Sequence, residues 1–408
     1  MTRTAQSTAA PRKVGVLLDG FVDLSGARDF MVAFVDALNR AKGDREVVLL
    51  LRVRPKKSLA DRLRYHLGLA NLNDLAQETL APLHAAGMSG DHIEVLRRGD
   101  TALRNACGRL GIDVIGPMTK CPKSDLNVPW FGYLYDFQHK HLSALFPAEE
   151  CQARDKRFGE ILSGAYAVVV NAFEVRRDVE RFFPGLENKV VPLSFNASPR
   201  HDWFDVDISG AQSKYGTGSR YFMVSNQFWL HKNHETVVES FAKLSADHPD
   251  INLVFTGDRF DPRSPTRLQD INNHVAGLGL TDRVHILGLV PKLDQIALMR
   301  GCIAMIQATS SEGGPGGGSV YDAISLGVPT IVSDIPINRE IEHLVSLYFS
   351  LNDVSDLAEK MEQSLLLPHA QPDKDDLLAA GAERREKHGH DIWRAIDMAA
   401  EAFARRSV

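Results

Sequence analysis

The stretch "CIAMIQATSSEGGPGGGSVYDAISLGVPTIVSD", residues 302–334, contains a complete strand, loop, helix and strand pattern. The apolar run 302–308 and the run 329–334 predict buried strands. A helix is expected from about Ser319 to Leu326, with Gly327 ending it. Five glycines and one proline fill the loop before that helix. Two strands joined by a helix are typical of a parallel sheet, so the stretch predicts an α/β fold.

The same alternation recurs over the rest of the chain. Apolar runs that predict strands fall in the first half at 14–19, 46–53, 113–118, 129–136 and 165–172, and in the second half at 221–226, 251–257 and 284–290. Strands this apolar are expected in parallel sheets that helices cover on both faces. The segment 194–215 is rich in Ser, Pro, Gly and Asp and predicts a linker. We therefore expect domains at 1–196 and 197–385, with a helix at 386–408 crossing back to the first domain.

Composition narrows the class of protein. A chain of 408 residues with 44% hydrophobic and 24% charged residues is an ordinary globular sequence long enough for two domains. The net charge of −5 does not indicate nucleic acid as a partner. The four cysteines form no metal or disulfide pattern, and the polar amino terminus lacks the apolar core of a signal peptide. We expect a cytoplasmic protein.

The glycine loop predicts an anion site. Glycine allows a ligand to approach the main chain, and N–H groups at the start of a helix bind phosphate. Carboxylates beside phosphate would repel it, so Glu312 and Asp322 fit sugar hydroxyls better, as a nucleotide-sugar requires. The alternative for each carboxylate is a helix cap or a solvated charge.

A second basic feature lies in "HKNHETVVESFAKL", residues 231–244. Asn233 is expected to cap a helix, which would place Lys232 as a surface cation at its positive end. The helix dipole disfavours a lysine there, so an anionic ligand explains it better. His231 and His234 are expected to be neighbours of that ligand or surface histidines rather than catalysts.

These motifs resemble the donor site of the retaining glycosyltransferases of family GT4. The resemblance rests on "EGGPGGGSVYDAISLGVPTIVSD", "VSNQFWLHKNHETVVESF", "TGD" and "VHILGLVPKLDQIALMRGCIAMIQATS", and covers most of residues 215–345. In the first half it rests on the loop after the first strand and on "YLYDFQHKHLSALFP". It implies a GT-B fold, in which two Rossmann-like domains face each other across a cleft, and metal-independent transfer without a cofactor.

The resemblance also assigns site residues. It implies catalytic roles for Asp136, His139, Lys232 and Glu312. The donor would contact Gly26, Asn226, Lys232, Arg259, Leu289, Glu312, Gly313, Gly314, Gly316, Gly317, Gly318, Ser319 and Asp322.

This chain departs from the family pattern at the same site. Asp322 replaces a second Glu, and the loop is two residues longer than usual. Asn226 stands where an Arg is common, and Arg259 is the residue expected to supply that missing cation.

A metal site is not expected. The Asp-x-Asp triplet at residues 205–207 lies in the predicted linker and fits a solvated segment. His139 with His141 lacks a third ligand.

Residues 52–72 combine leucines one helical turn apart with several basic residues. This pattern fits a basic amphipathic helix on an anionic membrane surface, or a packed helix with a solvated face. The membrane interpretation would make the acceptor lipid-linked.

The expected function is retaining transfer of a hexose, with mannose from GDP-mannose as one candidate, to a glycan or lipid-linked saccharide. Two alternatives remain open: a sugar-nucleotide epimerase of the same architecture, and a binding module without catalysis.

Overall fold

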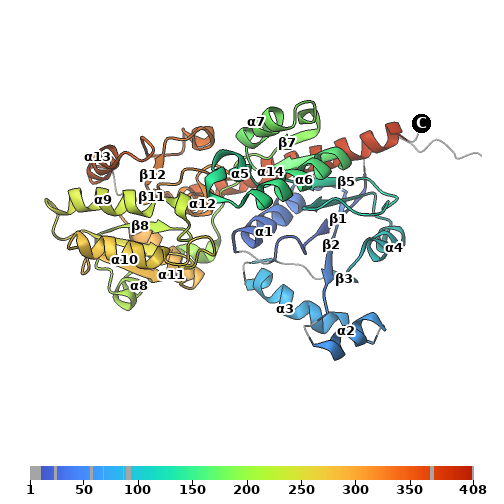
Figure 1. Ribbon diagram of the computed structural model, residues 1–408, viewed down its shortest axis with the longest axis horizontal. Coiled ribbons are helices and arrows are strands. Elements are labelled where there is room, and N and C mark those ends of the chain that lie inside the picture. Colours follow the sequence, from blue (N-terminus) through green and yellow to red (C-terminus); the bar gives the residue numbers. More distant parts are fainter. Residues whose placement is uncertain are drawn as a thin grey trace, which may run out of the picture. The chain divides into compact units, whose positions relative to one another are not determined.

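The computed structural model describes residues 11–22, 25–55, 58–67, 69–85, 87–88, 93–367 and 372–406. Its contacts divide the chain into two compact units, drawn as ribbons in Figure 1. Unit 1 comprises residues 1–135, 152–194 and 385–408, and unit 2 comprises 136–151 and 195–384. Within the described residues, no helix combines the length and apolarity that crossing a bilayer requires.

Unit 1 is built on a parallel sheet of seven strands in the order β3-β2-β1-β4-β5-β6-β7. Its strands are β1 (Lys13–Leu17), β2 (Glu46–Val53), β3 (Ile93–Arg97), β4 (Val114–Met118), β5 (Trp130–Tyr133), β6 (Ala167–Val170) and β7 (Val190–Pro192). Its helices are α1 (Ser25–Arg40), α2 (Leu59–His66), α3 (Leu72–Ala85), α4 (Asp100–Leu110), α6 (Ala148–Gly164), α7 (Phe173–Phe182) and most of α14 (Lys374–Arg406). The first four residues of α6 lie outside unit 1, since its boundary falls after Cys151.

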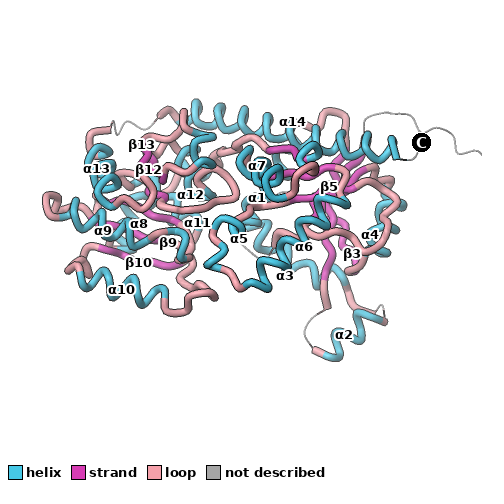
Figure 2. The backbone as a smooth tube through the Cα atoms, turned by 45° about the horizontal axis from the view of Figure 1, so that its top comes forward, coloured by secondary structure: helices cyan, strands magenta, loops and turns pink. Residues whose placement is uncertain are grey.

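The core of unit 1 joins the start of the sequence to its last helix. Val14 and Val16 of β1 pack with Phe34 of α1 and with Trp393 and Ile396 of α14. The indole of Trp393 also donates a hydrogen bond to the Leu38 carbonyl at 3.1 Å. Figure 2 shows α14 running past α1 and α7. This helix begins at Lys374, earlier than the 386 expected from the sequence.

Unit 2 repeats the topology with six parallel strands in the order β10-β9-β8-β11-β12-β13. Its strands are β8 (Tyr221–Ser225), β9 (Asn252–Thr256), β10 (Val284–Gly288), β11 (Met305–Gln307), β12 (Thr330–Ser333) and β13 (Leu347–Phe349). Its helices are α5 (Gln138–His141), α8 (Ile208–Tyr215), α9 (His234–Ser245), α10 (Arg267–Gly277), α11 (Lys292–Gly301), α12 (Gly317–Ser325) and α13 (Val354–Ser364).

Side chains of β8 point alternately to the two faces of this second sheet. Phe222 and Val224 belong to a hydrophobic cluster with residues of α9, α10 and α13. Tyr221 and Met223 belong to a second hydrophobic cluster with residues of α8, α11 and α12. Both faces are therefore covered, and the strands are buried as a parallel sheet requires. The predicted fold class of two Rossmann-like α/β domains is confirmed.

Two local predictions were wrong. Segment 194–215 is not a free linker, because Trp203 and Ala211 are buried in the core of unit 2 and residues 208–215 form α8. Asp205 and Asp207 of the 205–207 triplet are exposed, as expected, and Asp207 caps that helix by accepting from the Gly210 N–H at 2.9 Å. Residues 52–72 do not form one helix: the first two belong to β2, and α2 covers only Leu59–His66. Lys56 and Lys57 lie outside the described residues.

Strands β3, β7 and β13 were not expected from the sequence. β7 and β13 have only three residues each, and β3 includes Glu94 and Arg97. Their sequences carry a weak hydrophobic signal, so pairing with neighbouring strands rather than local pattern defines them.

Candidate functional site

The glycine loop lies where the strand order of unit 2 reverses. It follows β11, which pairs with β8, and on the other side of β8 the order runs back through β9 to β10. In open α/β sheets this switch point, at the carboxyl ends of the strands, is where ligands bind. The loop leads into α12, which begins at Gly317, two residues before the expected Ser319.

The loop backbone has two conformations that favour glycine. Gly316 and Gly317 have φ angles of 70° and 68°. A Cβ on Gly317 would approach the Glu312 carboxyl group to 3.0 Å, so a larger side chain there would displace that carboxylate.

Not every N–H group of the loop is available to a ligand. Gly316 N–H donates to Asn338 Oδ1 at 2.7 Å, and Gly317 N–H donates to the Gly314 carbonyl at 3.2 Å. Gly318 and Ser319 follow in the first turn of α12, where N–H groups have no acceptor within the helix. The Ser319 hydroxyl is buried and has no hydrogen-bond partner among the described residues. This helix start therefore presents three donors of the kind that bind an anion.

Lys232 and Glu312 form a buried ion pair beside this helix start. Lys232 ends the short 3-10 helix η4 (Leu230–Lys232), and its Nζ contacts Glu312 Oε1. The side chains are 7% and 11% exposed, so the expectation of a surface cation at Lys232 was wrong.

Asn233 occupies the predicted N-cap position of α9, but its side chain does not cap the helix. It has a positive φ of 52°, and its side chain makes no capping hydrogen bond. Instead, its Nδ2 donates to the Ala308 carbonyl at 2.9 Å, which ties η4 to the segment after β11.

Gln307, which the sequence analysis did not single out, links the loop to the neighbouring strand. Its Nε2 donates to Glu312 Oε1 at 3.1 Å and to the Gly316 carbonyl at 2.8 Å. Its Oε1 accepts from Asn226 Nδ2 at 2.6 Å, and Gln307 is fully buried. Position 226, where an arginine is common in the family that the sequence resembles, thus holds an asparagine whose amide is hydrogen-bonded to the amide of Gln307. A polar residue at the end of an otherwise apolar strand was the available signal.

Asp322 lies on α12 and forms an ion pair with a second lysine. Lys292, the first residue of α11, approaches Asp322 Oδ2 to 2.5 Å. The Lys292 ammonium also lies over the Trp203 ring, 5.2 Å from its centroid. Both carboxylates that flank the glycine loop are therefore paired with a lysine.

Arg259 and Leu289 lie at the edge strand β10, whereas the glycine loop follows β11 in the interior of the sheet. Arg259 Nη2 donates to the Ile286 carbonyl of β10 at 3.0 Å, and its guanidinium packs where a Gly288 side chain would be. Leu289 follows β10 and is exposed. β9 and β8 separate this edge strand from β11, so none of these contacts joins the two residues to the glycine loop.

Arg263 is another cation of unit 2 that the sequence analysis missed. Its guanidinium lies over the Trp229 ring at 5.4 Å and over the Phe146 ring at 5.2 Å. Burial, and then the charges of Lys232 and Arg263, lower the pKa of His231 to about 2. Arg263 therefore lies within electrostatic reach of the Lys232 segment.

Asp136 and His139 belong to segment 136–151, which joins unit 2. Asp136 Oδ1 accepts from the Gln138 N–H at 3.0 Å at the start of α5, and His139 is buried. Gly26, by contrast, lies in the first turn of α1 in unit 1, with nothing within 4 Å of where its Cβ would be.

His234 is a neutral buried ring. It stacks on Phe228 with centroids 4.4 Å apart, and burial lowers its pKa to about 3. Neither ring nitrogen has a hydrogen-bond partner among the described residues. The two histidines beside Lys232 are thus uncharged packing residues at neutral pH.

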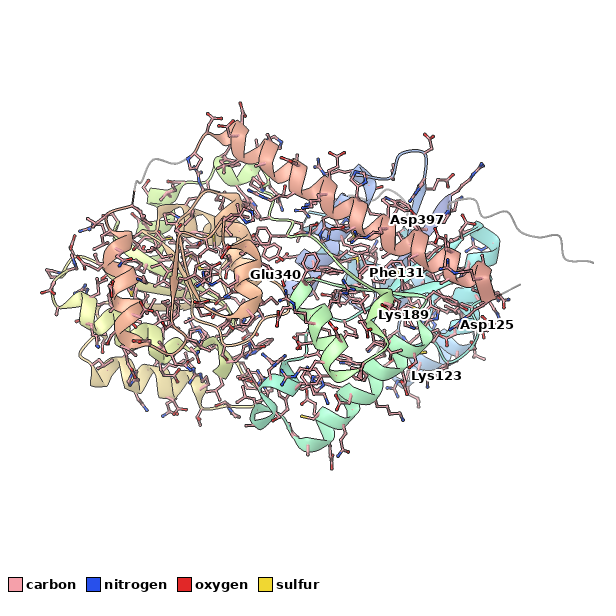
Figure 3. The ribbon with its side chains drawn as sticks, turned by 90° about the horizontal axis from the view of Figure 1, so that it is seen from above. Lys123, Asp125, Phe131, Lys189, Glu340 and Asp397 are labelled. Atoms are coloured by element: carbon pink, nitrogen blue, oxygen red, sulfur yellow. The ribbon has the colours of Figure 1, made fainter. Side chains whose placement is uncertain are left out.

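No group of three or more His, Cys, Asp or Glu side chains suited to a metal ion occurs among the described residues. A separate pocket of about 1130 Å³ lies in unit 1 near the amino ends of β2 and β7, against α14. Figure 3 labels two of its lining residues, Lys189 and Asp397. Its lining residues belong to unit 1, whereas the glycine loop belongs to unit 2.

Residues 207–383 match the model of the family "Glycosyl transferases group 1". A mannosylfructose-phosphate synthase of Agrobacterium fabrum (strain C58 / ATCC 33970) is 23% identical over 161 residues, which are 39% of this chain and 33% of that protein. The chain thus spans about a third of the length of this curated relative.

Two solved structures share the fold over nearly the whole chain. Anabaena Alr3699/HepE in complex with UDP and glucose has a TM-score of 0.59 at 14% identity, covering 97% of this chain and 99% of that one. Sucrose-phosphate synthase from Thermosynechococcus elongatus has a TM-score of 0.53 at 13% identity, with the same coverage. These likenesses show the GT-B type of fold, and the match to the family model covers less than half of this chain.

Proposed function

We propose that this chain is a metal-independent, retaining hexosyltransferase of family GT4 that uses a nucleoside diphosphate sugar. One observation carries the proposal. At the switch point of unit 2, the start of α12 presents the Ser319 hydroxyl and the N–H groups of Gly318 and Ser319 next to the Lys232–Glu312 pair. Donors aimed at an anion, beside a lysine and a carboxylate, suit a diphosphate joined to a sugar.

In this proposal the diphosphate lies against the start of α12. Transfer breaks the bond between the sugar C1 and the phosphate oxygen, and the electron pair leaves with the diphosphate. The acceptor hydroxyl oxygen forms the new bond to C1, and its proton passes to the departing phosphate oxygen. Lys232 and the helix N–H groups stabilise that growing negative charge, a contribution that typically changes rates by roughly 100-fold or more. The ion pair with Glu312 holds Lys232 in place before the donor arrives.

The two carboxylates have different proposed partners. Glu312 accepts hydrogen bonds from hydroxyl groups of the transferred sugar, and Asp322 accepts them from the ribose hydroxyls. Asp136 and His139 are assigned to the transferred sugar and the acceptor hydroxyl by resemblance alone.

The sugar and acceptor are part of the same proposal. The name of the Agrobacterium relative favours mannose as the first sugar to test, and the UDP and glucose in the Anabaena structure make UDP-glucose the second. The acceptor is a glycan or a lipid-linked saccharide, and a lipid-linked acceptor would require contact with a membrane.

Calorimetry with GDP, UDP, ADP and TDP tests the site directly. We expect one of them to bind, and Ser319→Ala, Gly317→Val and Asp322→Ala to weaken that binding. Glu312→Ala should leave the affinity for the bare nucleotide nearly unchanged and lower the rate with the full nucleotide-sugar. Equal loss of nucleotide affinity in both carboxylate variants would contradict the assigned roles.

Product analysis separates the proposal from its alternatives. A transferase consumes the donor and extends an acceptor, or hydrolyses the donor slowly without one. An epimerase releases a changed nucleotide-sugar with no acceptor present. A binding module binds the nucleotide and turns nothing over.

A further inference from the structure

Helix α2 exposes a row of leucines. Leu59, Leu63 and Leu67 are spaced four residues apart, on one face of the helix and its last turn, and are 85%, 60% and 63% exposed. Leu69 follows at 67% exposed. Single exposed leucines are common on soluble proteins, but four gathered on one short segment form an apolar patch that favours contact with another apolar phase.

The opposite face of α2 is firmly attached to unit 1. Tyr65 is buried, its hydroxyl donates to the Val53 carbonyl at 2.8 Å, and it accepts from the Arg98 N–H at 2.6 Å. Arg97 Nη1 donates to the Tyr65 carbonyl at 2.6 Å. These bonds fix α2 to the ends of β2 and β3 with its leucines outward. Figures 1 and 2 both show the helix at the margin of unit 1, beyond those strand ends.

The segment that carries these leucines is strongly basic. Residues 52–66 contain six Lys or Arg and one acidic residue, a net charge of +5 in a chain whose total is −5. Arg52 is paired with Asp19 at 3.0 Å. Arg54, Arg62 and Arg64 are exposed beside the leucines. Basic side chains around an apolar helix face are what an anionic bilayer attracts.

We propose that α2 is a docking surface for an anionic lipid bilayer, with Leu59, Leu63, Leu67 and Leu69 entering the acyl boundary. Arg54, Arg62 and Arg64 then lie at the level of the lipid phosphates, since arginine keeps its charged end in the polar layer. A second copy of this chain fits less well, because a symmetric contact would bring two +5 segments together. This inference rests on the proposed function and deepens it by naming the partner that would carry a lipid-linked acceptor.

Vesicle sedimentation tests the proposal with the full chain. We expect the parent to bind phosphatidylserine-containing vesicles, more weakly as salt rises, and to bind pure phosphatidylcholine vesicles poorly. The double variant Leu63→Ser with Leu67→Ser should lose roughly tenfold or more in affinity. Arg62→Gln with Arg64→Gln should lose a similar factor and most of the salt dependence. Leu366→Ser, which changes an 87% exposed leucine of unit 2, is the matched control and should bind like the parent.

Several outcomes would overturn the proposal. These are equal parental binding to charged and neutral vesicles, no loss in the leucine pair, and an equal loss in the control. A parental dimer that dissociates in the leucine variant would assign the surface to a second copy instead. Nucleotide affinity, which should match the parent in every variant, verifies folding. Bare vesicles contain neither donor nor acceptor, so these results do not depend on whether sugar transfer is found.

Discussion

Burial of the Lys232–Glu312 pair changes what a substitution at Lys232 does. Removing one member of a buried pair leaves the other charge without a partner, which typically costs about 3–5 kcal/mol. Lys232→Ala should therefore both abolish transfer and lower the free energy of unfolding by that order. The exposed position expected from the sequence predicted no loss of stability. Urea unfolding, with transfer rates at saturating donor, measures the two effects.

A double variant distinguishes the two contributions. Lys232→Met with Glu312→Gln removes both charges, so it should recover much of the stability while remaining inactive. If Lys232→Ala unfolds at the same urea concentration as the parent, the pair does not stabilise unit 2. Turnover near the parental rate would remove Lys232 from the mechanism.

Gln307 gives a second prediction at the residue scale. Gln307→Leu removes the hydrogen bonds to Glu312 and to the Gly316 carbonyl, so kcat should fall roughly tenfold or more, while affinity for the bare nucleoside diphosphate changes less. Gln295→Leu is the matched control, since Gln295 Nε2 donates to Ser225 Oγ at the same end of the sheet rather than to the loop. A loss of stability alone, with kcat unchanged, would make Gln307 a packing residue.

Sequence patterns identified some of these residues and missed others for a physical reason. Lys232 and Glu312 stood out because a charge beside a helix start or a glycine loop is locally unusual, and the structure brings them together. Gln307 and Asn338 did not stand out, because their partners are fixed by strand pairing and by a segment 22 residues away. A local pattern contains no information on such contacts.

At the scale of elements, α9 carries a pH-sensitive residue. The pKa of His234 is about 3 in the folded protein and near 6.5 in the unfolded chain. Between these values the unfolded chain binds a proton that the folded protein does not, so stability falls as pH drops from 6.5 towards 3. The slope is about 1.4 kcal/mol per pH unit for this histidine.

His234→Phe should remove this contribution. Phenylalanine keeps a flat ring against Phe228 and cannot be protonated, so the difference in stability between pH 7.5 and pH 5 should shrink by about 2 kcal/mol. Denaturant midpoints at the two pH values measure it. His343→Gln, at an exposed histidine, is the control and should behave like the parent. An unchanged pH dependence in His234→Phe would place the acid sensitivity elsewhere.

The start of α12 shows why element boundaries were less predictable than element types. The run of small and apolar residues after the loop predicted a helix, and a helix is there. It begins earlier because Gly316 adopts a positive φ and Asn338 accepts its N–H. Asn338 is distant in sequence, so the local pattern could not place the first residue.

At the scale of the whole molecule, chelation should not affect activity. Glu312 and Asp322 are each paired with a lysine, so neither is a vacant ligand for magnesium on a diphosphate. Activity should be the same with EDTA as without it. Loss of activity with EDTA, and its return with a divalent ion, would require the phosphate site to be reassigned.

The two-sheet architecture was predictable because ten apolar runs repeat a strand and helix rhythm in both halves. Which segment belongs to which unit was harder to predict from the sequence. Residues 136–151 lie within the first half of the sequence yet join unit 2, and 195–215 packs there through a few apolar side chains such as Trp203. Packing through so few apolar side chains does not change the composition of a segment enough to be recognised in the sequence.

The core of unit 1 contains residues that are synthesised last. Trp393 and Ile396 complete the core of unit 1, and a ribosome adds them only after all of residues 195–384. At about 5–20 residues per second, those 190 residues take roughly 10–40 s. Throughout that interval the nascent first unit has an uncovered apolar face on α1 and β1, and at its end unit 2 has its whole sequence whereas unit 1 still lacks residues 385–408. The later half of the chain should therefore mature first, and the earlier half should be the client of chaperones.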